Sequence, residues 1–108
     1  MEKVFLSYKS IKLGFLCRDE HGFCFVANET AIKKLQQKNP ILMKTFSLNL
    51  SGAEIYSNLP CLFSQFIPSK ERVDLLNKAG IIEGDDDFAK IYKLAGLNLI
   101  NINFKIHR

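Results

Sequence analysis

The sequence has no tryptophan, only three prolines and three cysteines, and no apolar run near the roughly 18 residues that a membrane-spanning helix requires. An odd number of cysteines, without a known spacing pattern, argues against a disulfide framework. The N-terminus turns polar by Ser7, too early for the apolar region of a secretory signal peptide. We therefore expect a protein of the reducing cytoplasm that does not contact a membrane.

Motifs for catalysis and for metal or phosphate binding are also missing. The sequence contains no CxxC, HExxH, phosphate-binding glycine loop, or H-R-D and D-F-G kinase motif. His21 and His107 have no partner at a metal-ligand spacing, and both are predicted to be solvated. Cys61, without a nearby histidine, is interpreted as a buried structural thiol. The sequence thus predicts no catalytic residue, no metal site and no cofactor.

The chain does contain enough apolar residues for a single folded domain, residues 1–108. Hydrophobic residues make up 47% and charged residues 24% of the 108 residues, close to the average for soluble proteins. The net charge of +4 mildly favours acidic partners. The densest basic cluster comprises Lys33, Lys34 and Lys38, and we interpret it as the solvated face of a helix.

The first quarter of the chain predicts β-strands. Val4–Leu6 and Ile11–Cys17 are rich in strand-forming residues, and 23–27 is the returning strand of a hairpin. The residues 19–22 between them, Asp-Glu-His-Gly, suit its turn.

The hairpin leaves two registers open for its cysteines. An even-numbered loop places Cys17 opposite Cys24, whereas a bulge at Gly22 places Cys17 opposite Phe25. A disulfide is not expected in a reducing compartment, so we predict two buried thiols.

A helix over Glu29–Lys38 follows, with Asn28 as its N-cap and Asn39-Pro40 ending it. Its apolar stripe consists of Ala31, Ile32 and Leu35. Alternating apolar and polar residues predict a half-buried strand over Met43–Leu50, ended by Ser51-Gly52.

The second half of the chain is predicted to be mostly helical. Asn58 caps a segment with Pro60 in its first turn, and Ser69 caps a helix over Lys70–Ala79 that Gly80 ends. The apolar residues of these two segments are Leu59, Leu62, Phe63, Phe66, Ile67, Val73, Leu75 and Leu76.

One of Asp85, Asp86 or Asp87 caps a third helix, which Gly96 closes. Its apolar residues are Phe88, Ile91, Tyr92 and Leu94. Alternation over Leu99–Phe104 predicts a final strand. The fold class that follows is α+β, a small and mostly antiparallel sheet of N-terminal hairpin strands and a C-terminal strand, packed with several short helices.

The order of short motifs resembles the N-terminal subdomain of HipA-type serine/threonine kinases, and especially HipS, the free-standing form of that subdomain. The matching motifs are Gly14-Phe15-Leu16, the turn at 19–22, Phe23-Cys24-Phe25, Phe46–Leu50, Phe63–Pro68 with Arg72 and Leu75-Leu76, Gly80, Asp86-Asp87-Phe88 and Gly96-Leu97-Asn98.

This resemblance implies a bacterial antitoxin that binds and restrains a HipA/HipT-like kinase toxin. It also implies a HipB-like helix-turn-helix DNA-binding protein as a further member of the complex. In that case the chain itself corresponds to the outer part of a kinase N-lobe, without nucleotide-binding or catalytic residues.

The aromatic-rich segment 55–63 is the candidate surface for this partner, because Tyr and Phe bury a large area for few rotatable bonds. Tyr56 and Leu59 lie at its edge and are the better candidates, whereas Leu62, Phe63 and Phe66 suit a core. The full set of candidate partner-binding residues is Ile55, Tyr56, Asn58, Leu59 and Phe63.

Three other functions stay open. The chain could be a structural complement of a split kinase, or an excised piece of a longer one. It could bind nucleic acid through a sheet bearing Phe15, Phe23 and Phe25 with a rim of lysines, although no direct nucleic-acid contact is expected. It could be an enzyme of unrecognised type.

Overall fold

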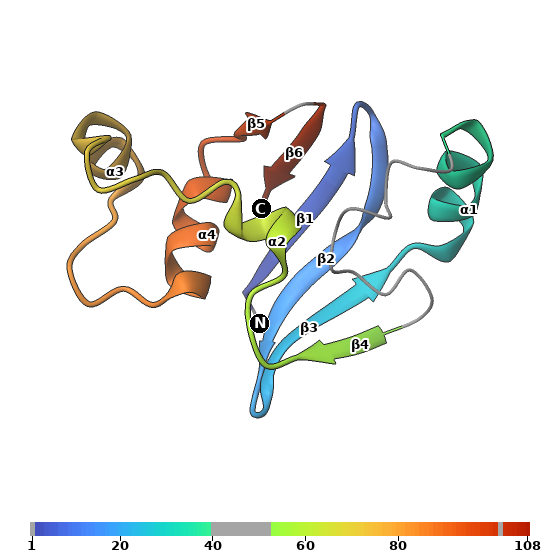
Figure 1. Cartoon of the computed structure of the whole chain (residues 1–108), viewed down its shortest axis with the longest axis horizontal. Helices are drawn as coiled ribbons and strands as arrows, with labels where there is room; N and C mark the ends of the chain where they lie inside the picture. The colour runs from blue at the N-terminus through green and yellow to red at the C-terminus, as the bar shows by residue number, and fades with distance from the viewer. Residues whose placement is uncertain (1, 40–52, 102) are drawn as a thin grey trace.

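The computed structural model describes residues 2–39, 53–101 and 103–108, which form a six-stranded antiparallel sheet with four short helices (Figure 1). The fold class predicted from the sequence is confirmed. The strand order across the sheet is β4-β3-β2-β1-β6-β5. The strands are β1 Lys3–Tyr8, β2 Ile11–Asp19, β3 Gly22–Ala27, β4 Ala53–Tyr56, β5 Ile100–Asn101 and β6 Phe104–His107. The helices are α1 Glu29–Lys38, α2 Cys61–Ser64, α3 Val73–Ala79 and α4 Asp87–Ala95.

The N-terminal hairpin has the even-numbered loop. Asp19 pairs with Gly22 and Cys17 with Cys24, so the alternative register with Cys17 opposite Phe25 is wrong. The Asp19 carboxylate accepts a hydrogen bond from the backbone N–H of His21 at 3.0 Å, which fixes the turn.

A bulge between β1 and β2 directs an extra side chain into the core. Leu6 pairs with Gly14 and Ser7 with Lys12, which leaves Leu13 unmatched. Leu13 is fully buried in the same cluster as Ile32 of α1. The bulge therefore ties the sheet to α1.

The helix predicted for Glu29–Lys38 is confirmed as α1, with the predicted N-cap. The side chain of Asn28 caps the helix by accepting a hydrogen bond from the N–H of Ala31 at 3.3 Å. Ile32 and Leu35 are buried, and Ala31 is half-buried. The basic cluster on this helix, Lys33, Lys34 and Lys38, is exposed as expected. The strand predicted for Met43–Leu50 lies outside the described residues.

Helix α4 also follows its prediction. Of the three candidate aspartates, Asp86 is the N-cap, and it accepts from the N–H of Ala89 at 2.8 Å. Phe88, Ile91 and Leu94 are buried, and the helix ends at Ala95 with Gly96 as its C-cap.

Helix α3 is shorter than predicted. It begins at Val73 instead of Lys70, with Arg72 and not Ser69 at the N-cap position. The reason is a turn closed by a hydrogen bond from Arg72 N–H to Ser69 C=O at 3.0 Å. The apolar pattern predicts that Val73, Leu75 and Leu76 are buried, but Val73 is 56% exposed and the two leucines are only half-buried. Gly80 does end it in the left-handed conformation.

Three further boundaries differ from the prediction. Helix α2 has Pro60 at its N-cap position, so Asn58 does not cap it. Strand β4 was not predicted. The final strand is instead a hairpin of β5 and β6, because Asn103 adopts a φ of 71° and reverses the chain.

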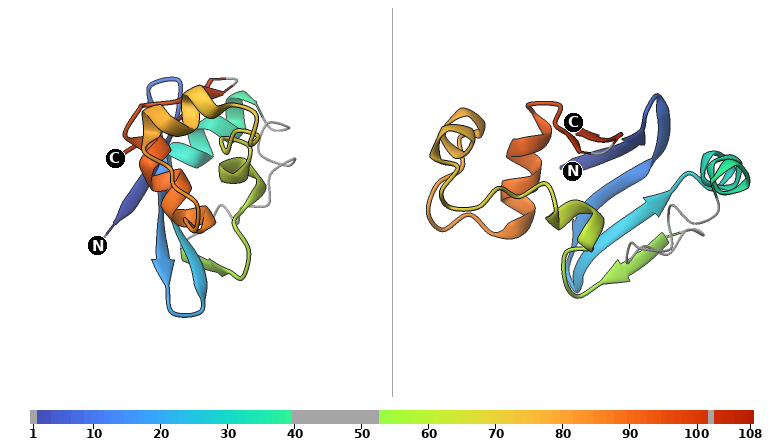
Figure 2. Two further views of the ribbon diagram at one scale, coloured as in Figure 1. Left: turned by 90° about the vertical axis from the view of Figure 1, so that its left-hand side faces the viewer. Right: turned by 45° about the horizontal axis from the view of Figure 1, so that its top comes forward.

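The hydrophobic core lies between one face of the sheet and the helices. Phe25 and Phe63 contact each other there with ring centroids 5.9 Å apart, and Phe88 and Ile91 of α4 are buried beside Leu6 and Ile106 in the same cluster. In contrast, α3 lies beyond α4, away from the sheet (Figure 2). In the described part of the chain, no helix combines the length and apolar character needed to cross a membrane.

Candidate docking surface

The face of the sheet opposite the core carries three rows of side chains, which we call the outer face. Residues paired directly across antiparallel strands point to the same side of a sheet, and successive residues alternate. Since Leu16 and Phe25 point into the core, their neighbours along each strand point outward. The rows are Lys3-Cys17-Cys24-Ile55, His107-Phe5-Phe15-Val26 and Ile100-Lys105-Ser7-Lys12.

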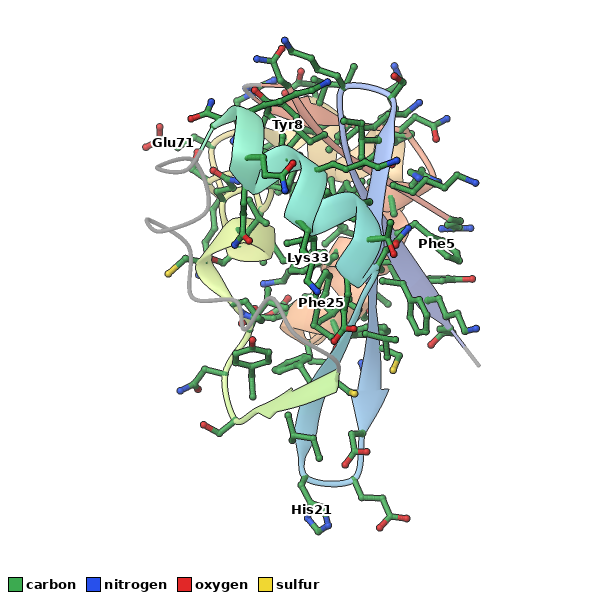
Figure 3. The ribbon with its side chains drawn as sticks, turned by 90° about the vertical axis from the view of Figure 1, so that its right-hand side faces the viewer. Phe5, Tyr8, His21, Phe25, Lys33 and Glu71 are labelled. Carbon is green, nitrogen blue, oxygen red and sulfur yellow. The ribbon has the colours of Figure 1, made fainter. Side chains whose placement is uncertain are left out.

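Aromatic side chains form the centre of the outer face. The rings of Phe5 and Phe15 lie 5.7 Å apart, and His107 stacks on Phe5 at 5.5 Å. Figure 3 shows Phe5 and Phe25 on opposite sides of β2, so that only Phe25 points toward the core. The ammonium group of Lys3 lies 4.5 Å from the centroid of the Phe15 ring. A hollow of 240 Å³ opens between Phe5, Phe15 and Val26.

Two exposed isoleucines extend this surface to the opposite edges of the sheet. Ile55 on β4 is 51% exposed, and Ile100 on β5 is 69% exposed. The outer face therefore has an exposed isoleucine at each edge and half-buried phenylalanines in the middle, and Lys105, Ser7 and Lys12 lie between these phenylalanines and Ile100.

His107 is fixed in place, contrary to the sequence prediction of a solvated side chain. Its ring is half-buried against Phe5, and its Nε2 atom lies 3.2 Å from Oγ of the buried Ser7. His21, by contrast, is exposed in its turn as predicted.

The cysteines differ from one another in burial. Cys17 is 6% exposed, whereas Cys24 is half-buried, so only one of the two predicted buried thiols is buried. Burial raises the pKa of the Cys17 thiol, and the neighbouring Cys24 thiol raises it further. Cys61 is exposed, which corrects its interpretation as a buried thiol. Cys17 and Cys24 are free thiols.

The structure does not gather the five predicted site residues on one surface. Ile55 lies on the outer face, but Tyr56 follows it along β4 and points to the opposite side, where it packs against the core. Phe63 is fully buried and belongs to the core, so it cannot contact a partner. Asn58 is exposed and Leu59 is half-buried. A hollow of 280 Å³ is lined by Tyr56, Ser57, Asn58, Leu59, Pro60 and Cys61.

The aromatic set considered for nucleic-acid binding is also divided by the sheet. Phe25 is fully buried, and Phe23 stacks toward Phe88 on the core side at 6.3 Å. Only Phe15 of the three points outward. The true outer set, Phe5, Phe15 and His107, was missed, although the strict alternation of Val4, Phe5 and Leu6 indicates that Phe5 faces away from its two neighbours.

No group of three or more His, Cys, Asp or Glu side chains lies close enough to hold a metal ion among residues 2–39, 53–101 and 103–108. A hollow of 410 Å³ lies beside α3 and the loop after it, and Ile67, Leu76, Ile81 and Ile82 are among its lining residues.

Comparison of the chain with protein-family models, with curated proteins and with solved structures finds no match. The resemblance to HipA N-terminal subdomains therefore remains a sequence-based prediction.

Proposed function

We propose that this chain is a non-catalytic binding module that docks onto a HipA-type serine/threonine kinase and restrains it. The sequence motifs suggest the class of partner. The observation that carries the docking role is the outer face, where the half-buried Phe5 and Phe15 lie between the exposed Ile55 and Ile100 at the two edges of the sheet.

Exposed apolar surfaces of this kind favour protein association. Contiguous apolar patches rimmed by polar groups are typical of interaction sites, and aromatic side chains contribute much of the energy at such sites. Here Phe5 and Phe15 occupy the centre, and lysines and a histidine surround them. Release of water from these side chains would provide the driving force for docking.

The rigidity of the site also supports this role. The central side chains are carried by paired strands, and the His107 ring is held by Phe5 and Ser7. A preorganised surface loses little conformational entropy on binding.

The size of the face is suitable for one side of a stable interface. The six strands have two to nine residues and average about five, so the sheet spans roughly 24 by 17 Å. Its side chains present more area than this flat outline. A standard interface buries about 800 Å² on each partner. The flat outline of the outer face is about half of such an area, and the relief of its side chains and the residues at its edges add to it.

The direct test is to mix the chain with a HipA-like kinase that lacks this subdomain. We expect the two proteins to co-purify and kinase autophosphorylation to fall as the chain is added. A kinase that remains fully active and unbound at saturating chain would contradict the proposal.

A matched pair of substitutions tests the surface. Ile55→Ser removes an exposed apolar side chain from the outer face, and Val73→Ser removes one of similar exposure, 51% against 56%, from α3. We expect Ile55→Ser to weaken kinase binding about tenfold. Val73→Ser should leave binding unchanged.

Thermal unfolding of both variants provides the control, because exposed positions change stability little. Weaker binding by Val73→Ser alone would move the docking site to α3 and contradict the assignment to the outer face.

A further inference from the structure

We infer that the outer face recognises a partner surface whose apolar centre is bordered by Asp and Glu side chains. This inference rests on the proposed function and specifies the chemistry of the partner. It follows from the charges on the outer face and from how they are placed around its aromatic centre.

The charged positions of the outer face are mostly basic. Pairing across β1, β2 and β6 places Lys3, Lys12 and Lys105 on it. The acidic position among these pairs, Asp19, lies at the tip of the hairpin, where its carboxylate is bonded to the N–H of His21. The aromatic centre itself is therefore bordered by positive charge.

These lysines lie next to apolar side chains. Lys3 covers the ring of Phe15, and Lys12 lines the same hollow as Phe5 and Phe15. Lys105 is paired with both Ser7 and the exposed Ile100. A partner group that contacts the phenylalanines would consequently lie within reach of ammonium groups.

The positive charge is not neutralised within the described part of the chain. The ion pairs there join Arg18 to Asp86, Arg72 to Asp74 and Lys93 to Asp85, and all of them lie away from the outer face. Carboxylates on a partner would complement the lysines, speed the encounter and set the orientation, whereas a basic partner would be repelled.

A protein fits this surface better than a nucleic-acid strand. Bases stack on aromatic planes, but much of the accessible outer face is aliphatic or thiol: Val26, Ile55, Ile100 and Cys24. Three lysines are also few for a site that follows a phosphate backbone. Aliphatic groups with a basic border match an apolar protein patch with an acidic border.

Charge reversal tests the inference with a matched control. The variant Lys3→Glu/Lys12→Glu/Lys105→Glu reverses the outer face, and Lys33→Glu/Lys34→Glu/Lys38→Glu reverses three exposed lysines of α1 by the same total charge. We expect the outer-face variant to bind the kinase more than about tenfold more weakly at low salt, and the α1 variant to stay within about threefold of the wild type. Wild-type affinity should fall as salt rises, whereas the affinity of the outer-face variant should rise with salt, because salt then screens a repulsion between like charges.

The outcomes separate the inference from the proposed function. Equal affinities of the two variants for the kinase would overturn the inference alone, because the complex would still form. Failure of the wild-type chain to bind the kinase at all would overturn both. Binding of a labelled oligothymidylate by the wild type, lost in the outer-face variant, would overturn the inference in favour of nucleic acid.

Discussion

At the scale of single residues, Gly14 shows how tightly the sheet is built. Its φ is +148°, and a Cβ atom added there would lie 2.2 Å from the carbonyl oxygen of Val26 and 2.9 Å from Cζ of Phe25. This close approach accompanies the bulge that turns Leu13 into the core. A side chain at position 14 would disturb both the strand pairing and the core.

We therefore predict that Gly14→Ala lowers the free energy of unfolding by about 3 kcal/mol, from backbone strain and steric overlap together. Gly80→Ala is the control. Position 80 also has a positive φ, but no atom lies within 4 Å of the added Cβ, so its cost should be about 1 kcal/mol. Urea denaturation of both variants measures the difference. Equal costs would show that the contact with Val26 is unimportant.

Asp85 provides a prediction on pH. The Lys93 ammonium, 2.6 Å away, and the N–H of Ile82, 3.0 Å away, hold the pKa of the Asp85 carboxyl below its ordinary value. A lowered pKa means that the interaction stabilises the fold above the ordinary value of about 3.9 and is lost as pH falls through the pKa of the folded protein.

Asp85→Asn should therefore have a lower melting temperature than the wild type at pH 6. The difference should shrink as the pH is reduced below about 4, since protonation then removes the same charge from the wild type. Melting temperatures measured from pH 6 to pH 2 check this. A difference independent of pH would contradict the role of the ionised carboxylate.

At the scale of elements, the sequence predicted those that carry their own boundary signals. Helices α1 and α4 have side-chain N-caps, Asn28 and Asp86, and both helices bury an apolar stripe. The β2–β3 hairpin has a turn sequence that fixes its loop. Strand β4 has no such signal. Its four residues form a strand because they pair with β3. This pairing is a tertiary contact that the local sequence does not reveal.

Helix α3 was predicted too long for a related reason. Its sequence has helical spacing, but Leu75 and Ala79 are only partly buried against the core, and no residue of the helix is fully buried. Helix propensity alone is weak for a segment of seven residues.

This difference in packing predicts a difference in local stability. Amide hydrogens of α3 should exchange at least about tenfold faster than those of α4, since α4 has four buried residues and α3 has none. Hydrogen exchange followed by NMR on the free chain measures it. Similar protection of the two helices would show that α3 is held by contacts other than burial.

At the scale of the whole molecule, the candidate site chosen from the sequence is a continuous segment of the chain and not one face of the sheet. Segment 55–63 is continuous in sequence, yet it contributes Ile55 to one face of the sheet and Tyr56 to the other. The outer face combines residues from both ends of the chain, such as Phe5 and His107. Knowing that they meet requires the register of β1 with β6, and strand alternation alone does not supply it.

Strand β6 contributes a buried side chain to the core, so a substitution there tests the stability of the whole fold. Ile106 on β6 is fully buried, whereas Ile100 on the neighbouring β5 is 69% exposed. Ile106→Ala should cost about 2–5 kcal/mol of unfolding free energy. Ile100→Ala should cost less than about 0.5 kcal/mol. Urea denaturation compares them, and similar values would mean that β6 does not stabilise the core.

The position of β6 beside β1 has a consequence for protein synthesis. A nascent chain emerging from the ribosome presents Phe5 long before His107 has been added, so this stacked pair on the outer face forms only after β6 has been synthesised. Under the proposed function, fragments that end before β6 would therefore lack half of this pair and would compete poorly for the kinase.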